Sequence, residues 1–339
     1  MLLNSLRSEI LELLHGKRQE HPLCFSSLST IISPALDARG LTFPEIHHDA
    51  QKMVIAAASA YELYGWYSAT LPTDLCVEAE ALGATVDFRE DMPEAMWPLV
   101  SEPLFASLAD VQLERGDFTQ RGRIPLIVDA VRELKKRVGE HVVVGAWFPG
   151  PFTLAVQVID YDALLPAVRH SPHEVARALD AFTDLLIPVA LAYENAGADF
   201  ITIHEMGGSP GVVGPRGFGE LILPRLQRMT NAISGPTILS VCGNTNNAME
   251  LLAAAGANAL NVDQTNDLAR SRQILGNDVL LFGNLDPVKV IARGTPELIR
   301  AEVKRVVQAG VDAVMPGCDL FLQTPVENLR AMVEGTEEL

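Results

Sequence analysis

Short runs of β-branched and other apolar residues alternate along the chain with longer segments whose apolar residues recur every three or four positions. The longer spacing is typical of amphipathic helices, and short apolar runs between turn residues are typical of buried strands. The strand-like runs lie at residues 22–26, 66–70, 142–147, 200–204, 237–241, 259–262, 279–283 and 313–315. Eight strands that alternate with helices predict a parallel sheet closed into a (β/α)8 TIM barrel.

Two segments depart from a minimal barrel. Residues 1–21 have the spacing of an amphipathic helix, which predicts an N-terminal helical extension before the first strand. Residues 72–141, after the second strand, are more than one crossover needs, so we expect an insertion that carries extra helices over or beside the barrel mouth. No low-complexity linker or charge block divides the chain, and residues 1–339 are predicted to form a single domain.

The charge, the apolar runs and the cysteines indicate which partners and which cellular compartment to expect. The formal net charge of −17 gives a surface that repels phosphate backbones, so a nucleic-acid partner is not expected. No apolar run approaches the ~20 residues needed to cross a bilayer, and the N-terminus lacks the apolar core of a signal peptide, so no membrane association is expected. The four widely spaced cysteines suit a reducing compartment, which favours a cytoplasmic protein.

Candidate metal ligands follow several of the predicted strands. Active groups of TIM barrels come from the carboxyl ends of the strands, where the βα loops converge. His204 and Glu205 end the fourth strand, Cys242 follows the fifth, Asp263 the sixth and Cys318 the eighth. Two thiolates with a nitrogen or oxygen ligand suit zinc, and three protein ligands leave one position open for catalysis.

The pattern leaves the third ligand open. Glu205 could supply a carboxylate oxygen, and His204 competes for the same place. Because neighbouring residues alternate across a strand, only one of the two can point inward. Ser240 lies two positions before the first rim cysteine and shares its face. It is expected either to give a supporting hydrogen bond or simply to leave space. Cys24 and Cys76 are interpreted as small buried hydrophobes.

Several motifs together resemble the methylcobamide:coenzyme M methyltransferases of the uroporphyrinogen decarboxylase superfamily. They are VEAEALG (77–83), GPFTLA (150–155), CGNT (242–245), FGNLDP (282–287) and PGCDLFLQTPVENLRAMV (316–333). The resemblance covers most of the chain. It implies an enzyme that transfers a methyl group from a methylated corrinoid to a thiol such as coenzyme M. The arginine-containing segment of uroporphyrinogen decarboxylases is replaced here by CFSSLSTI (24–31), so decarboxylation of that substrate is not expected.

The resemblance also implies a zinc site. The family's motif is His-x-Cys followed by a distant cysteine; Cys242 and Cys318 match the cysteines, and the histidine position falls on Ser240. Glu205 is similar in position to an acidic residue of the family and is expected to complete the ligand set and to act in catalysis, with His204 as the alternative. One Zn²⁺ per chain would deprotonate the acceptor thiol and keep it nucleophilic.

The corrinoid is expected to arrive on a separate, transiently bound protein. The chain lacks the Asp-x-His-x-x-Gly segment typical of chains that ligate cobalamin through their own histidine. Asp263 and Asn284 are expected to act in catalysis. Asp286, Ser240 and His204 are expected to contribute to cofactor binding. The structural alternative for Asp263, Asn284 and Asp286 is that they hydrogen-bond the βα loops.

Two other functions stay open at this point. One is methyl transfer from a corrinoid to tetrahydrofolate, an acceptor that needs no thiol activation and that would equally belong to one-carbon metabolism. The other is a non-catalytic module that binds a corrinoid or a metal on the same barrel. The serine at the family's histidine position is the reason to weigh both.

Overall fold

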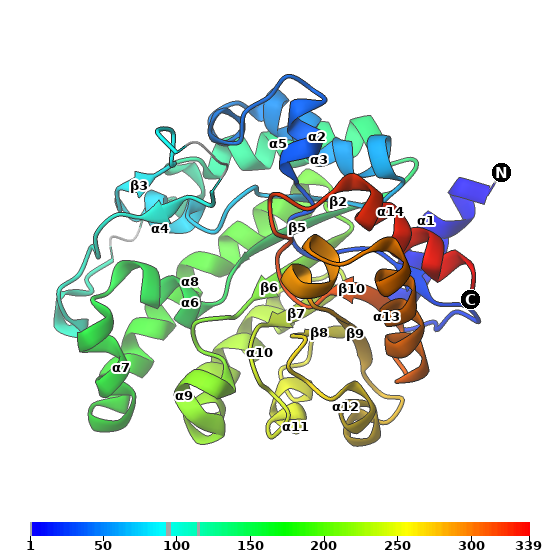
Figure 1. Ribbon diagram of the computed structural model, residues 1–339. Helices are drawn as coiled ribbons and strands as arrows, with labels where there is room; N and C mark the ends of the chain where they lie inside the picture. Colours follow the sequence, from blue (N-terminus) through cyan, green and yellow to red (C-terminus); the bar gives the residue numbers. More distant parts are fainter. Residues whose placement is uncertain (1, 93–95, 114–115) are drawn as a thin grey trace.

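The main sheet has the topology of a TIM barrel. The computed structural model describes residues 2–92, 96–113 and 116–339. Residue 1, in the predicted N-terminal helix, and residues 93–95 and 114–115, within the predicted insertion, lie outside the described residues. Within the described residues, eight strands pair in parallel in the order β1-β10-β9-β8-β7-β6-β5-β2 (Figure 1). Each predicted strand is present, and the predicted (β/α)8 fold is confirmed. The strands are β1 (Leu23–Cys24), β2 (Ser68–Leu71), β5 (Val143–Pro149), β6 (Phe200–His204), β7 (Thr237–Val241), β8 (Ala259–Val262), β9 (Leu280–Leu285) and β10 (Ala313–Pro316).

The barrel is closed between β1 and β2 by side chains. These two strands lie at opposite ends of the hydrogen-bonded order. Ser68 Oγ accepts a hydrogen bond from the Ser26 N–H at 2.9 Å and donates one to the Ser26 carbonyl at 2.9 Å. Thr70 Oγ1 donates to the Leu28 carbonyl at 2.6 Å. Side-chain hydroxyl groups on β2 therefore join it to the segment that follows β1 and complete the barrel wall there.

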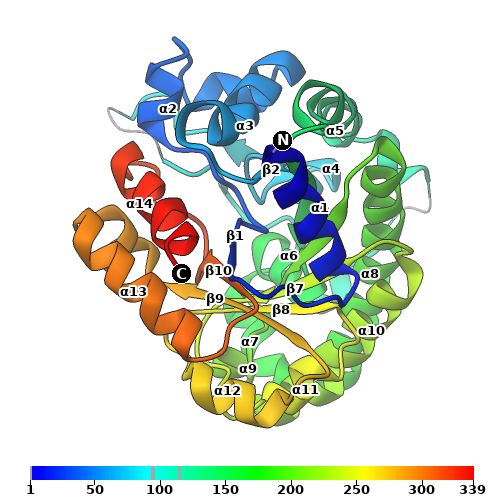
Figure 2. The same ribbon diagram turned by 90° about the vertical axis from the view of Figure 1, so that its right-hand side faces the viewer.

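Helices surround the sheet on its outer side (Figures 1 and 2). A typical one is α3, where the Asp49 carboxylate accepts the N–H groups of Gln51 and Lys52, and Gly65, with φ +71°, ends the helix. The α-helices are α1 (Leu2–Leu14), α2 (Ser33–Asp37), α3 (Ala50–Tyr64), α4 (Val77–Ala81), α5 (Ile124–Val138), α6 (Pro151–Val158), α7 (Tyr161–His170), α8 (Pro172–Ala196), α9 (Pro210–Gly217), α10 (Leu223–Ala232), α11 (Met249–Ala253), α12 (Leu268–Leu275), α13 (Pro296–Gln308) and α14 (Val326–Glu337). Shorter 3-10 turns are η1 (Pro44–His47), η2 (Leu108–Asp110) and η3 (Phe118–Gln120), and η4 (Phe218–Ile222) and η5 (Pro287–Ala292) are π-helical.

The segment after β2 differs from its prediction in one respect. It contains α4, η2, η3 and the crossover helix α5, as expected of an insertion with extra helices. It also contains an antiparallel pair, β3 (Val86–Asp87) and β4 (Leu99–Val100), which was not predicted. Strands of two residues are too short to produce a periodic pattern, so the sequence gives no signal for them.

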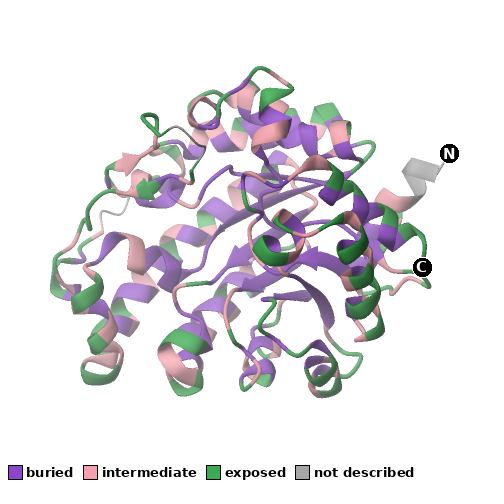
Figure 3. Cartoon of the chain, viewed as in Figure 1, coloured by how far each residue is buried: buried purple, intermediate pink, exposed green. Residues whose placement is uncertain are grey.

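The strands of the barrel are buried and the outer faces of the helices are exposed (Figure 3). Inside the barrel, the Phe25 ring contacts the Phe200 and Phe282 rings edge-on, with centroids 6.2 and 5.5 Å apart. β1 and β6 lie far apart in the strand order, so these rings meet across the interior. The barrel is therefore a packed core, and chemistry is restricted to its mouth.

Candidate metal centre

Three potential ligands converge at the barrel mouth: His204, Cys242 and Cys318. Among the described residues, their ligand atoms form a group within 4.8 Å of one another. They come from the end of β6, the loop after β7 and the loop after β10. The two Sγ atoms are bonded to each other at 2.30 Å, with the Cα atoms 6.1 Å apart. When reduced, the pair would present two neighbouring thiols beside an imidazole.

The sequence around Cys318 allows its loop to lie close to the loop after β8. A Cβ atom on Gly317 would lie 2.7 Å from the backbone nitrogen of Gln264, so only glycine fits there without displacement. The close approach places Cys318 over the same end of the barrel as Cys242. Both predicted cysteine positions are thus brought together, although 76 residues separate them in the chain.

His204 is the last residue of β6 and shares its face with the inward-facing Phe200. It pairs in register with Ser240 on β7, and its Nδ1 lies 3.3 Å from the Ser240 Oγ. Its Nε2 is buried without a hydrogen-bond partner among the described residues. Burial lowers the pKa of His204 to about 4, so the ring is neutral at physiological pH. Neutral imidazole is the form that binds metals.

The structure places Glu205, the expected third ligand, outside this group. Its carboxylate accepts hydrogen bonds from the Phe152 N–H at 3.0 Å, the Thr153 hydroxyl at 2.6 Å and the Gly208 N–H at 2.9 Å. A Cβ atom on Gly150 would lie 2.4 Å from this carboxylate, so that glycine makes room for it. Burial raises the pKa of Glu205, and these hydrogen bonds oppose the rise. Glu205 therefore joins the start of α6 to the loop after β6.

The other predicted polar residues hold βα loops. Asp263 Oδ1 accepts the Thr265 N–H at 2.7 Å, and Asn284 Nδ2 donates to the Asp263 carbonyl at 3.1 Å. Asp286 accepts the N–H groups of Val288 and Lys289 at the start of η5. These contacts are of the kind expected in the structural alternative, in which the three residues hydrogen-bond the βα loops. Asn284 Oδ1, however, is buried without a partner among the described residues.

A cavity of about 340 Å³ opens beside the metal centre. Asp319 connects the two, since its Oδ2 lies 3.8 Å from His204 Nε2. Burial raises the pKa of Asp319 to about 7, against a backbone hydrogen bond from Ser29. Trp147, whose ring meets the His204 ring edge-on at 6.2 Å, forms part of the wall. The cavity is lined by Leu75, Cys76, Trp97, Pro98, Leu99, Val100, Trp147, Gln157, Met206 and Asp319.

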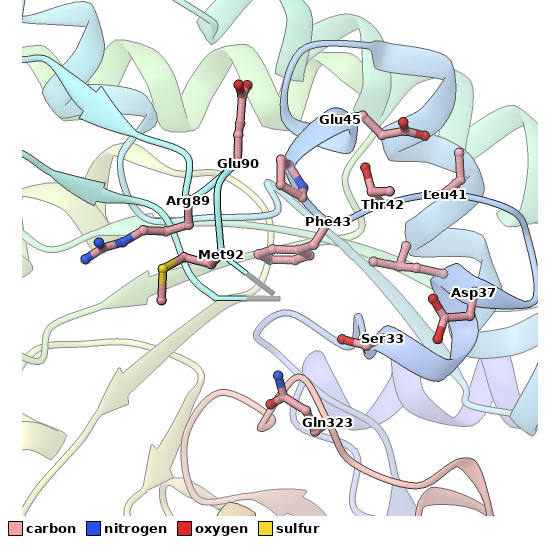
Figure 4. A pocket seen from close by; sticks show the side chains of 12 residues that line it. Ser33, Asp37, Leu41, Thr42, Phe43, Glu45, Arg89, Glu90, Met92 and Gln323 are labelled. Carbon is pink, nitrogen blue, oxygen red and sulfur yellow. The ribbon is translucent and has the colours of Figure 1, made fainter. Parts of the chain in front are cut away.

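A second cavity, of about 580 Å³, lies between the loops after β1 and β10 and the inserted hairpin. Phe43, Ser33 and Gln323 face it from separate segments (Figure 4). The Phe43 ring meets the Trp97 ring at 5.2 Å, and Trp97 lines the first cavity. Two aromatic side chains thus form a wall between the two cavities.

A buried charged network ties the insertion to the barrel. Arg123 donates to Asp74 at 2.7 and 3.1 Å and to Glu80 at 2.5 Å, and His47 Nδ1 lies 2.8 Å from Asp74. The guanidinium and the imidazole hold the pKa of Asp74 well below its usual range against the effect of burial. Nearby Glu78 is fully buried, and burial raises its pKa to about 8. The sequence pattern did not reveal this network, because its members come from four separate segments.

The chain belongs to the uroporphyrinogen decarboxylase (URO-D) family, whose model matches residues 5–339. Within the family it is similar to "Methylcobamide:CoM methyltransferase MtaA" of Methanosarcina barkeri, with 30% identity over 336 residues and 98% of each chain covered. It is also 32% identical over 315 residues to "Methylcobamide:CoM methyltransferase MtbA" of Methanosarcina mazei, covering 92% of this chain and 91% of the relative. A solved methyltransferase structure from Methanosarcina mazei superposes with a TM-score of 0.92 at 28% identity, covering 98% of both chains. The expected superfamily and the expected class of enzyme, a methyltransferase, are confirmed.

Two further results bear on the expectations from sequence. Among the described residues, no helix is long and apolar enough to cross a membrane. The cavity beside the metal centre was not anticipated, because its residues are scattered between positions 75 and 319. Asp319 had one available signal, its place directly after a predicted ligand cysteine.

Proposed function

We propose that this protein transfers a methyl group from a methylated corrinoid to a thiol, at a zinc centre held by His204, Cys242 and Cys318. The observation that carries the proposal is the convergence of these three ligand atoms, within 4.8 Å, at the barrel mouth. The relatives named above are named for the same reaction type, with CoM as the acceptor. A thiol acceptor is therefore preferred to tetrahydrofolate.

The residues present fit a zinc ion. Two sulfur atoms and one imidazole nitrogen are a donor set that zinc prefers, and His204 Nε2 is a buried nitrogen with no hydrogen-bond partner among the described residues. Three protein ligands would leave a position for the acceptor sulfur. Bound zinc would act as a Lewis acid that lowers the pKa of the acceptor thiol, so that the nucleophilic thiolate predominates at neutral pH.

The chain's own residues would position the ligands and shape the space for the acceptor. Ser240, 3.3 Å from His204 Nδ1, fixes the orientation of the imidazole and leaves Nε2 as the nitrogen without a hydrogen-bond partner among the described residues. Trp147 packs against the same imidazole and closes one side of the cavity. The aromatic and aliphatic walls of that cavity would exclude water from the reacting sulfur, which strengthens electrostatic interactions there.

A separate corrinoid protein would bring the methyl donor to the mouth. Met206 and Leu99 line the cavity and remain 38% and 40% exposed, so they offer apolar contact to an arriving cofactor or protein. Because both ligand cysteines must be reduced to bind zinc, we also propose that the enzyme works in a reducing compartment such as the cytoplasm.

Demethylation of methylcobalamin, followed by its absorbance change, tests the proposal. Reduced, zinc-loaded protein is expected to consume methylcobalamin in the presence of a thiol and to release the methyl thioether. Cys242→Ser, Cys318→Ser and His204→Ala should lose zinc and at least about 100-fold in rate, whereas Cys24→Ala, at a buried cysteine on β1, is a matched control that should retain both. Full activity in the Cys242→Ser or Cys318→Ser variant would contradict the zinc centre. Corrinoid binding without methylation of any thiol would favour a non-catalytic module.

A further inference from the structure

The cavity beside the metal centre has mostly apolar walls and few polar groups. Trp97, Trp147, Leu99, Val100 and Met206 provide much of its lining. Its Asp319 carboxyl reaches to 3.8 Å from His204 Nε2. An acceptor whose sulfur lies at the metal centre would therefore extend the rest of its chain into this cavity.

The polar atoms available in the cavity are mainly hydrogen-bond acceptors. Asp319 Oδ1 and Gln157 Oε1 are buried and have no partner among the described residues. The Gln157 amide is oriented by its Nε2, which donates to the Leu75 carbonyl at 3.1 Å, so its oxygen is the free end. A donor, Trp147 Nε1, is also buried without a partner in the described part of the chain. Buried acceptors without partners are costly, and a ligand that donates hydrogen bonds relieves that cost.

No lysine or arginine is found among the described residues that line this cavity. The buried guanidinium of the insertion, Arg123, is already bound by Asp74 and Glu80. An anionic group that entered the cavity would lose its hydration, gain no counter-ion and meet the carboxyl group of Asp319. The formal net charge of −17 also repels an approaching anion.

We propose that the acceptor is a small thiol whose far end donates hydrogen bonds, as a hydroxyl or ammonium group does, and that Asp319 selects it against thiols with an anionic end. This inference rests on the proposed function and narrows its substrate class. It distinguishes the chain's acceptor from coenzyme M, which is 2-mercaptoethanesulfonate. The selection acts through the hydrogen bonds that the buried acceptor oxygens take from the far end of the thiol. It is reinforced because the described lining offers a sulfonate no lysine or arginine with which to pair.

Three thiols with the same two-carbon chain test the proposal: 2-mercaptoethanol, cysteamine and 2-mercaptoethanesulfonate. The kcat/KM of each is measured with methylcobalamin and reduced, zinc-loaded wild-type protein, with rates expressed per thiolate. The hydroxyl and ammonium thiols are expected to exceed the sulfonate by roughly tenfold or more. Calorimetric binding of the three S-methyl thioethers, which need no thiolate, is expected to follow the same order.

Two substitutions of aspartate by asparagine test whether Asp319 sets the preference among the three thiols. Asp319→Asn should reduce the preference for cysteamine over the sulfonate by about tenfold, because it keeps the shape and replaces one acceptor oxygen by an NH2 group that can donate to the sulfonate. Asp37→Asn makes the same change at the separate cavity of Figure 4 and should leave the order unchanged. A wild-type enzyme that methylates the sulfonate best would overturn this inference and leave the proposed function intact. Ordered thioether binding with no methylation of any thiol would instead overturn the proposed function.

Discussion

His204 and Ser240 occupy paired positions on neighbouring strands, with the imidazole Nδ1 3.3 Å from the hydroxyl oxygen. The family pattern that the sequence resembles has a histidine where this chain has Ser240. In the proposed centre the nitrogen ligand therefore comes from β6 instead of β7. The two positions are direct neighbours across the sheet, so either can supply a nitrogen close to Cys242.

The first prediction concerns the affinity for zinc. His204→Ala should weaken zinc binding by about 100-fold or more, because it removes a ligand, and Ser240→Ala by about 10- to 100-fold, because it frees the ring. Competition with a chromophoric chelator measures both. A double variant that exchanges the two residues, His204→Ser with Ser240→His, should recover most of the affinity. Unchanged affinity in His204→Ala would remove this residue from the centre.

The second prediction concerns the oxidation state of the cysteine pair. In the structure Cys242 and Cys318 are bonded, whereas Cys24 and Cys76 are free and buried. Denatured oxidised protein should therefore react with about two equivalents of thiol reagent and reduced protein with about four. Only reduced protein should take up zinc, because the metal binds thiolates. Zinc should in turn slow reoxidation, and equal zinc uptake by both forms would disprove the role of the sulfur atoms.

The third prediction separates Glu205 from the metal centre. In Glu205→Gln one carboxylate oxygen is replaced by an amino group, so a backbone N–H, that of Phe152 or Gly208, loses its acceptor. The free energy of unfolding in urea should fall by about 1–3 kcal/mol. Zinc stoichiometry measured by metal analysis should stay at about one per chain. Loss of zinc from a correctly folded Glu205→Gln protein would restore the original expectation that this carboxylate is a ligand.

The fourth prediction concerns stability against pH. Burial raises the pKa of Glu78 to about 8 from an ordinary 4.5, while Asp74 adds to the rise. The unfolded chain releases this proton near pH 4.5 and the native state near pH 8. The contribution of Glu78 to stability should therefore be largest below this window and fall as the pH rises through it.

Glu78→Gln tests that assignment. The amide has no proton to release, and its oxygen can still accept the hydrogen bond from the Tyr193 hydroxyl, 3.4 Å from Glu78 Oε1 in the structure. Urea unfolding at pH 6 and pH 8.5 should show a smaller loss of stability in the variant than in the wild-type protein. An identical pH dependence in both proteins would assign the effect to another group.

The sequence predicted the strands of the barrel because each is a short apolar run between turn residues. It missed β3 and β4, which are too short to show a period. The two ligand cysteines could be located because both follow strands of one barrel. The third ligand could not be chosen, because whether His204 or Glu205 faces inward depends on the exact strand end. It also depends on the partners of Glu205, two of which, Phe152 and Thr153, lie more than 50 residues earlier in the chain.

Three hydroxyl-mediated contacts, from Ser68 and Thr70 to the backbone of Ser26 and Leu28, complete the cylinder between its first and last paired strands. The loop that follows Leu28 carries the Ser29 amide bonded to Asp319, so this stretch of the wall, which side chains close, adjoins the Asp319 carboxyl group. Thr70→Val, although far from either sulfur in the sequence, would remove the hydroxyl that donates to the Leu28 carbonyl, one residue before the amide that holds Asp319.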